Sequence, residues 1–343
     1  MQYRTLGGTG IQVSTYALGT LMLGGMGNPD VDDSVRIIHK ALDSGINLVD
    51  TADRYSRGVS EEVLGKALKG RRDEVVLATN FHGEMSDTDP NMRGASRRWI
   101  MSAVEGSLKR LGTDHLDLYQ VHRPDPGTDI EETLSALSDL VRSGKVRAIG
   151  TSTFTPSQLV QAQWASERRG LERFRTEQPP YSILNRSIEA EVLPLCQEYG
   201  VGTLVYSPLS GGMLTGRVRK GQESDSVRKG FGMPMFDDER RLDAVEALIA
   251  LADEAGMKVA HMAMAFAIAH PGVTSALIGP RTMEHLDDLL EGVGTSLSDD
   301  LLDRIDEIVP PGTDVSRLHS AWTPPALERP ALRRRPVAER TAA

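Results

Sequence analysis

A short apolar strand followed by an amphipathic helix recurs along most of the chain, and this alternation limits the folds open to it. Between the strands, apolar residues recur with the period of a helix, as at Ile100, Val104, Leu108 and Leu111. Eight strand–helix units within about 275 residues predict an α/β fold, a (β/α)8 TIM barrel. The eight expected strands are residues 16–20, 46–50, 74–79, 116–122, 145–150, 174–178, 201–207 and 273–279.

A doubly wound sheet is the main alternative. If such a sheet bound a dinucleotide, it would need a glycine-rich turn directly after its first strand. Gly7-Gly8-Thr9-Gly10 comes before the first expected barrel strand and lacks the third glycine at the required spacing. We interpret it as the tip of an N-terminal β-hairpin, so the barrel is favoured.

Two segments depart from the repeat. Residues 211–236 form a long loop after the seventh strand, and long loops in compact domains are usually functional or disordered. We expect the barrel to occupy residues 1–309 and a Pro/Arg-rich C-terminal tail to occupy residues 310–343. Trp322 in this tail needs a place to bury its ring. The tail therefore either closes the mouth of the site, packs on a remote face, or does not pack.

Composition excludes several classes of function. With 39 Lys and Arg against 48 Asp and Glu, the net charge of −9 argues against nucleic-acid binding. The single cysteine excludes an intramolecular disulfide, and the histidines show no metal-ligand spacing, so no metal site is expected. The N-terminus lacks a signal-peptide pattern and no apolar stretch is long enough to span a membrane. We therefore expect a cytoplasmic protein, of undetermined oligomeric state.

Polar side chains stand where successive barrel strands are expected to end. Asp50 ends the second strand, Asn80 follows the third and His122 ends the fourth, while Tyr55 lies five residues beyond Asp50. The carboxyl ends of parallel barrel strands meet at one face, where reactive groups gather. A phenol, an imidazole and a carboxylate in one place suggest proton transfer to a carbonyl oxygen, although strand-end polar groups also serve simply to cap loops.

The motifs around these residues resemble the signature of the aldo-keto reductases. They include Asp50-Thr-Ala-Asp-Arg-Tyr55, Asp117-Leu-Tyr-Gln-Val-His122 and Tyr206-Ser-Pro-Leu-Ser-Gly-Gly, with further matches at residues 60–68, 144–150 and 277–281. They occur in the family's order and cover about residues 1–290. The resemblance implies a barrel that binds NADP(H) in an extended pose without a Rossmann domain and reduces aldehydes or ketones.

By this resemblance Tyr55 is the general acid, Asp50 its charged partner, and His122 the group that orients the carbonyl. The largest departure is Asn80, at the position of the catalytic lysine. An ammonium there would pair with the aspartate and depress the tyrosine pKa, whereas a carboxamide is neutral. An engineered inactivation, a natural divergence and a non-catalytic role stay open. Because the other positions fit, we favour an introduced or recent change in an enzyme framework.

The cofactor residues are also carried over by resemblance. Ser152 and Thr153 replace a Ser-Asn pair that holds the nicotinamide carboxamide, Gln178 completes this grip, and Tyr206 stacks on the ring. Arg281 and His285 stand where the family holds the 2′-phosphate, with Asp288 near the adenine and Leu289 in place of an asparagine. The other expected cofactor residues, several of them from the loop that covers the pyrophosphate, are Gly19, Thr20, Leu21, Ser207, Pro208, Leu209, Gly211, Leu214, Gly216, Arg217 and Gly279.

Two functions follow from the resemblance. The first is an NADPH-dependent reductase of a small aldehyde or ketone, favoured by Asp50, Tyr55 and His122. The second is an NADP(H)-binding auxiliary subunit of the potassium-channel β type with little turnover, toward which Asn80 leans. The identity of the carbonyl substrate does not follow from the fold.

Overall fold

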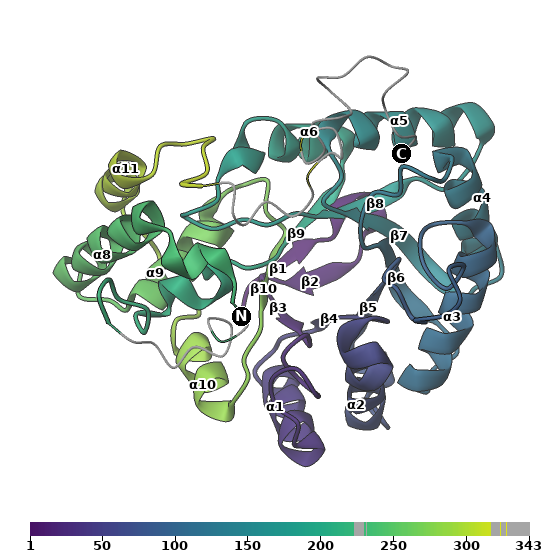
Figure 1. Cartoon of the computed structure of the whole chain (residues 1–343), viewed down its shortest axis with the longest axis horizontal. Coiled ribbons are helices and arrows are strands. Elements are labelled where there is room, and N and C mark those ends of the chain that lie inside the picture. The colour runs from purple at the N-terminus through teal and green to yellow at the C-terminus, as the bar shows by residue number, and fades with distance from the viewer. Residues whose placement is uncertain (223–229, 231, 317–322, 324–326, 328–343) are drawn as a thin grey trace.

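A closed barrel of eight parallel strands forms the centre of the computed structural model, which describes residues 1–222, 230, 232–316, 323 and 327. Neighbouring strands follow the order β10-β3-β4-β5-β6-β7-β8-β9, so the sheet closes between β9 and β10 and again between β10 and β3. Helices surround the barrel, as Figure 1 shows, and the predicted (β/α)8 fold is confirmed. The barrel strands are β3 (Tyr16–Gly19), β4 (Leu48–Ala52), β5 (Val76–Phe81), β6 (Leu116–Val121), β7 (Val146–Ser152), β8 (Phe174–Gln178), β9 (Gly202–Val205) and β10 (Ser275–Ile278).

The helices begin and end at signals that the sequence carries. Thr155 and Gln158 form a reciprocal capping box at the start of α5, with Pro156 in the first turn. The apolar face predicted in α3 is buried. The helices are α1 (Val31–Asp43), α2 (Val59–Ala67), α3 (Arg97–Leu111), α4 (Ile130–Arg142), α5 (Pro156–Arg169), α6 (Val192–Tyr199), α8 (Glu239–Glu254), α9 (Val259–Ala269), α10 (Met283–Glu291) and α11 (Asp299–Ile308).

Several strands run further toward their carboxyl ends than the sequence predicted. The second and third barrel strands are Leu48–Ala52 and Val76–Phe81, so Asp50 and Asn80 lie inside β4 and β5 rather than at or after their ends. Ala52 pairs with Asn80 in a continuous parallel ladder. At the mouth of a closed barrel, a strand can continue through polar residues after its apolar residues have ended. Hydropathy alone therefore predicts the end of such a strand too early.

An N-terminal hairpin of β1 (Tyr3–Thr5) and β2 (Gln12–Ser14) closes the amino end of the barrel, as predicted for the Gly7–Gly10 turn. Gly7 has φ +52°, and a Cβ there would lie 2.6 Å from the Arg175 carbonyl oxygen and the Gly202 nitrogen. The turn can therefore press directly against the strand ends. Leu6 is fully buried in the inner apolar layer of the barrel and helps to fill its amino end.

Part of the chain beyond the barrel is also held in place. The guanidinium of Arg241, from α8, is fully buried and donates to the side-chain oxygens of Asn185 (2.7 Å), Ser210 (3.0 Å) and Ser316 (2.9 Å). Ser316, near the start of the expected tail, is thus held against α8. Trp322, for which closure of the mouth, packing on a remote face and no packing were left open, and residues 223–229 of the long loop lie outside the described residues. Among the described residues, no helix has the length and apolar character of a membrane span.

Leu6 gives a test of the barrel floor. Truncation by Leu6→Ala leaves a cavity among residues that cannot collapse around it, so we expect a loss of about 2–5 kcal/mol in the free energy of unfolding. Urea titration measures this loss. Val160→Ala on α5, a position 38% exposed, is the control and should cost far less. A cost for Leu6→Ala as small as that of the control would contradict this role of the hairpin.

Candidate active site

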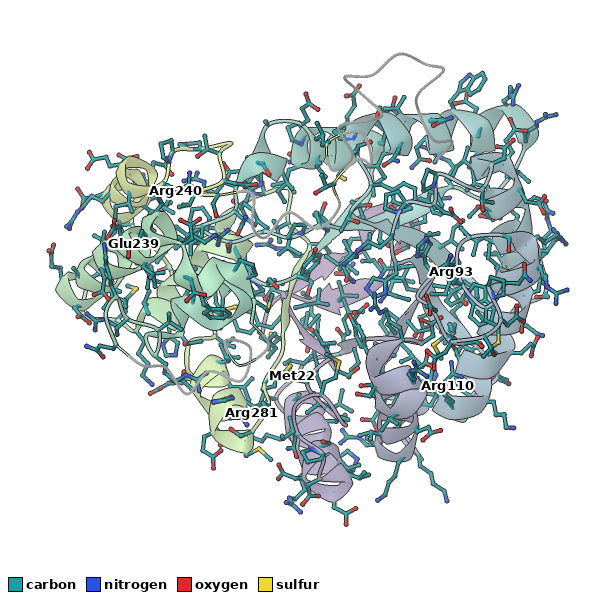
Figure 2. The ribbon with its side chains drawn as sticks, viewed as in Figure 1. Met22, Arg93, Arg110, Glu239, Arg240 and Arg281 are labelled. Carbon is teal, nitrogen blue, oxygen red and sulfur yellow. The ribbon has the colours of Figure 1, made fainter. Side chains whose placement is uncertain are left out.

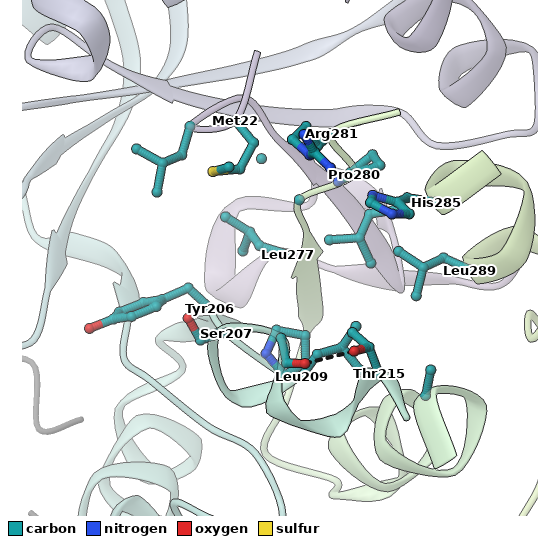
Figure 3. A pocket seen from close by; sticks show the side chains of 18 of the residues that line it. Met22, Tyr206, Ser207, Leu209, Thr215, Leu277, Pro280, Arg281, His285 and Leu289 are labelled. Carbon is teal, nitrogen blue, oxygen red and sulfur yellow. Dashed lines mark hydrogen bonds between the residues drawn. The ribbon is translucent and has the colours of Figure 1, made fainter. Parts of the chain in front are cut away.

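One large cavity of about 1090 Å³ opens at the carboxyl end of the barrel. Its inner part is lined by Asp50, Tyr55 and His122, and its outer part by Arg281 and His285. Figure 3 shows the cavity from close by, with Tyr206 on one side and Arg281 and His285 on the other. The structure therefore places most of the expected catalytic and cofactor residues along one continuous space.

Asp50 lies at the inner end of this cavity and is 1% exposed. Its Oδ2 atom accepts hydrogen bonds from Asn80 Nδ2 (3.0 Å), Gln178 Nε2 (3.0 Å) and Gln120 Nε2 (3.3 Å). No cationic side chain of the described residues forms an ion pair with it. Burial is the largest influence, and it raises the pKa of Asp50 to about 7 although the hydrogen bonds from Gln178 and Asn80 lower it.

Asn80 and Gln120 belong to a network that the sequence only partly indicated. Asn80 Nδ2 also donates to the Thr51 carbonyl oxygen (2.7 Å), and its Oδ1 accepts from Gln120 (3.1 Å). Gln120 in turn accepts from the Thr176 hydroxyl (2.9 Å). Gly150 leaves the space for this arrangement, since a Cβ there would lie 1.9 Å from Thr176 Oγ1. Both donor hydrogens of the Asn80 carboxamide and its oxygen thus have partners, and the side chain itself carries no charge.

Tyr55 is presented by a strained turn, η2 (Tyr55–Gly58), directly after β4. Ser56 and Arg57 both have positive φ values, of 49° and 53°, an arrangement common at functional sites. The Tyr55 and His122 rings meet edge to face, with centroids 5.8 Å apart. Burial and the nearby charge of Asp50 raise the pKa of Tyr55 well above its ordinary value, so the phenol holds its proton.

A buried ion pair supports this turn from behind. Glu61 of α2 is fully buried and accepts from Arg110 Nε (2.7 Å) and the Thr79 hydroxyl (2.7 Å). A Cβ on Gly58 would lie 2.6 Å from Arg110 Cδ, so the arginine stem packs under the turn. Figure 2 shows Arg110 beside α2 and α3. No local pattern in the sequence indicates this ion pair, because Arg110 lies 49 residues from Glu61.

His122 is buried, and its Nδ1 atom has no hydrogen-bond partner among the described residues. Burial, followed by the charges of Arg123 and Arg54, lowers the pKa of His122 well below its ordinary value. The imidazole is therefore neutral at physiological pH. A neutral ring can donate one hydrogen bond toward a carbonyl oxygen without releasing a proton to it.

The residues expected to hold the nicotinamide differ in how they face the cavity. Ser152 is fully buried, and its hydroxyl donates to the Gln178 carbonyl oxygen (2.8 Å) instead of lining the space. Gln178 lines the cavity, but its side-chain nitrogen is already bound to Asp50. Thr153 adopts φ 62°, a conformation that an asparagine tolerates better than a β-branched residue. Glu177 holds this turn by accepting from the Phe154 amide (3.2 Å).

Most of the other expected cofactor residues line the same cavity. Thr20 and Leu214 do not: the Thr20 hydroxyl donates to the Asp50 carbonyl oxygen (3.2 Å), and Leu214 is fully buried. Asp288 and Leu289 lie along the outer wall. The expected residues that do line the cavity are Gly19, Leu21, Asp50, Tyr55, His122, Gln178, Tyr206, Ser207, Pro208, Leu209, Gly211, Gly216, Arg217, Gly279, Arg281 and His285.

Cations gather at the outer end of the cavity. Arg217 forms a 2.6 Å hydrogen bond with His285 Nε2, and Arg281 lies on the same wall. Burial, then the charges of Arg217 and Arg281, lowers the pKa of His285. Two guanidiniums around one point suit a phosphate group. The donor set and the size of the space thus fit a dinucleotide that carries a phosphate at its adenosine end.

His261, Asp288 and Glu291 come close enough to hold a metal ion, although their spacing in the sequence is not that of a metal site. Lys258 Nζ already bonds both carboxylates, at 2.6 Å each. The Lys258 ammonium thus already provides the positive charge between these carboxylates, so we infer no metal site here.

Comparisons with known proteins agree with the arrangement of the site. A family model described as "Aldo/keto reductase family" matches residues 16–310. Over 333 residues the chain is 40% identical to "Uncharacterized oxidoreductase YrpG" of Bacillus subtilis, covering 94% of this chain and 100% of that protein. It is 40% identical over 308 residues to "Aldo-keto reductase YhdN" of the same organism, covering 87% and 90%. It is 33% identical over 323 residues to "Probable voltage-gated potassium channel subunit beta" of Arabidopsis thaliana, covering 90% and 97%.

The raised pKa of Asp50 predicts a dependence of stability on pH. Between its ordinary value of 3.8 and about 7, the folded protein keeps a proton that the unfolded chain releases. The free energy of unfolding therefore falls as pH rises through this window, by up to about 1.4 kcal/mol per pH unit from this group. Asp50→Asn removes this contribution.

Urea titrations from about pH 5 to pH 8 measure it. We expect the stability of Asp50→Asn relative to the parent to rise with pH and then level off. Asp53 and Glu177 are also buried acids with pKa values raised mainly by burial, and their contribution is common to both proteins. The exposed Asp73→Asn serves as control. A difference between Asp50→Asn and the parent that is independent of pH would contradict the raised pKa.

Proposed function

The chain belongs to the aldo/keto reductase family, and on this premise we propose that it reduces a small aldehyde or ketone to an alcohol with NADPH. It is an oxidoreductase by that membership. The observation that carries the proposal is a single cavity with Tyr55 and His122 at one end and Arg217 and Arg281 at the other. The cytoplasmic location and the barrel boundary at residue 309 are parts of the same proposal.

The inner residues support carbonyl reduction. When bound, NADPH supplies the hydride to the carbonyl carbon. The Tyr55 hydroxyl then donates its proton to the carbonyl oxygen, and neutral His122 orients that oxygen through a hydrogen bond. The Tyr206 ring lines the same inner wall and can support a flat ring beside it.

Asp50 and Asn80 set how well Tyr55 can give up its proton. With no ammonium beside it, Asp50 raises the pKa of Tyr55 when it is ionised, which makes the phenol a poorer acid. At neutral pH, with a pKa of about 7, Asp50 is close to half protonated. We therefore propose slow turnover with the binding of NADPH preserved.

An auxiliary role is the second candidate. The neutral Asn80 favours it, since a subunit that senses the cofactor does not need rapid proton transfer. The similarity to a plant protein named as a probable potassium channel β subunit also supports an auxiliary role. The two candidates differ in turnover, not in NADPH binding.

The outer end of the cavity predicts a preference for NADPH over NADH. Arg281 can pair with a 2′-phosphate in a bidentate manner. We expect Arg281→Ala to weaken NADPH binding roughly ten- to a hundredfold while changing NADH binding little. Fluorescence titration of both nucleotides measures this. Arg240→Ala, an exposed arginine that does not line the cavity, is the control. Equal affinities for the two nucleotides in the parent would refute the preference.

Asn80 gives the test between the two candidates. We expect Asn80→Lys to accelerate single-turnover reduction, because a well-tuned acid contributes roughly 10²–10⁴-fold to such a step. NADPH affinity should stay the same, since Asn80 does not line the cavity. Stopped-flow measurement of NADPH oxidation compares the variants. Asn80→Met is the control, because methionine is about as long as lysine but carries no charge.

Parent turnover equal to that of Asn80→Lys would show that another group supplies the proton. Tight NADPH binding with no turnover even in Asn80→Lys would instead favour the auxiliary role.

A further inference from the structure

Two arginines line the cavity at the end where Tyr55 and His122 lie. Arg54 directly precedes Tyr55, and Arg123 directly follows His122. Neither forms an ion pair with a carboxylate of the described residues. In a chain with a net charge of −9, two guanidiniums without carboxylate partners in one cavity call for a partner from outside the chain.

Arg123 is fixed in direction by the residues around it. Its NH1 atom donates to the His122 carbonyl oxygen (2.6 Å) and lies 3.4 Å from Ser152 Oγ. The side chain is half-buried, so its charge acts with little screening by solvent. Guanidinium groups carry five N–H donors, and the Arg123 contacts engage only NH1.

Arg54 is exposed at the mouth and held by its stem. A Cβ on Gly83 would lie 2.7 Å from Arg54 Cβ and Cδ, so the stem packs on this glycine. The φ of Gly83 is not positive, so the backbone conformation does not require a glycine there. The glycine is needed because a side chain would collide with Arg54. The loop after β5 thus provides a groove for the Arg54 stem and holds the charge at the cavity.

These two arginines are separate from the cations of the outer end. The charges of Arg123 and Arg54 act on the pKa values of Tyr55 and His122, whereas those of Arg217 and Arg281 act on His285. Electrostatic influence of this kind falls with distance, so it assigns each pair of arginines to its own end of the cavity. A 2′-phosphate at the outer end leaves Arg54 and Arg123 free for the substrate.

We propose that the substrate carries an anionic group, a carboxylate or a phosphate, in addition to its carbonyl, and that Arg54 and Arg123 bind this anion beside Tyr55. The inference rests on the proposed reductase function and adds the class of substrate to it. Arg123 contributes a donor fixed by its hydrogen bonds, and Arg54 an exposed donor whose stem is held on Gly83, which suits short substrates with the two groups close together. Both side chains act as specificity residues, and the proton still comes from Tyr55.

Matched pairs of substrates test the proposal. Succinic semialdehyde against butanal isolates a carboxylate, and glyceraldehyde 3-phosphate against glyceraldehyde isolates a phosphate. We expect kcat/KM for one or both anionic members to exceed that of the neutral member roughly ten- to a hundredfold, the effect of a charge-assisted contact. The pair that shows the preference identifies the anion. The rates are measured in both the parent and Asn80→Lys, so that slow turnover of the parent does not hide a preference between substrates.

Variants assign the preference to the arginines. Arg54→Gln should reduce the ratio of anionic to neutral kcat/KM roughly tenfold. Gly83→Ala keeps the charge but pushes the Arg54 stem away, so it should reduce the same ratio. Arg57→Gln is the matched control, because Arg57 is exposed two residues beyond Tyr55 and pairs with Asp87 outside the cavity. It should leave the ratio as it is in the parent.

Calorimetry provides a readout that does not need turnover. In the presence of saturating NADP⁺, 4-hydroxybutyrate should bind and 1-butanol should bind much more weakly, with binding of the acid reduced in Arg54→Gln. Equal kcat/KM within both pairs, or equal binding of the acid and the alcohol, would overturn the anionic substrate class alone. If NADPH itself does not bind, the proposed reductase function fails, and the substrate class fails with it.

Discussion

Asp50 is a carboxyl group at the inner end of a cavity, surrounded by the carboxamides of Asn80, Gln120 and Gln178. An ionised carboxylate buried without a cation is costly, and the group responds by raising its pKa to about 7. The acidity of Tyr55 depends on this carboxylate. The closed barrel enforces the arrangement, because β4, β5, β6 and β8 each bring one member of the network to the same point.

The fold was largely readable from the sequence. The eight strands and the hairpin turn at Gly7–Gly10 follow from local patterns, and the structure bears them out. Asp50, Tyr55 and His122 were named from their motifs, and all three line one cavity, while their roles stay predictions. Asp50 and Asn80 were placed about two residues too late relative to their strands, because polar residues inside the barrel mouth look like strand ends.

Contacts between distant segments could not be predicted in the same way. Arg110 lies 49 residues from Glu61, and Gln120 lies 70 residues from Asp50, so no spacing rule connects either pair. Arg54 and Arg123 are adjacent to motif residues, yet only the closed barrel shows that both line one cavity. The roles of Gly83 and Gly150 could not be predicted for the same reason. The side chains for which they leave room, Arg54 and Thr176, come from other parts of the chain.

The protonation state of Asp50 is the central claim, and ¹³C NMR of protein labelled at the aspartate carboxyl carbons measures it directly. Asp50→Asn assigns the resonance by its disappearance. We expect a titration midpoint near 7 in the parent, because Asp50 is buried without a counter-charge. We expect a much lower midpoint in Asn80→Lys, where an ammonium would favour the ionised form. A parent midpoint close to the ordinary value of 3.8 would show that Asp50 is ionised at neutral pH without a cation beside it.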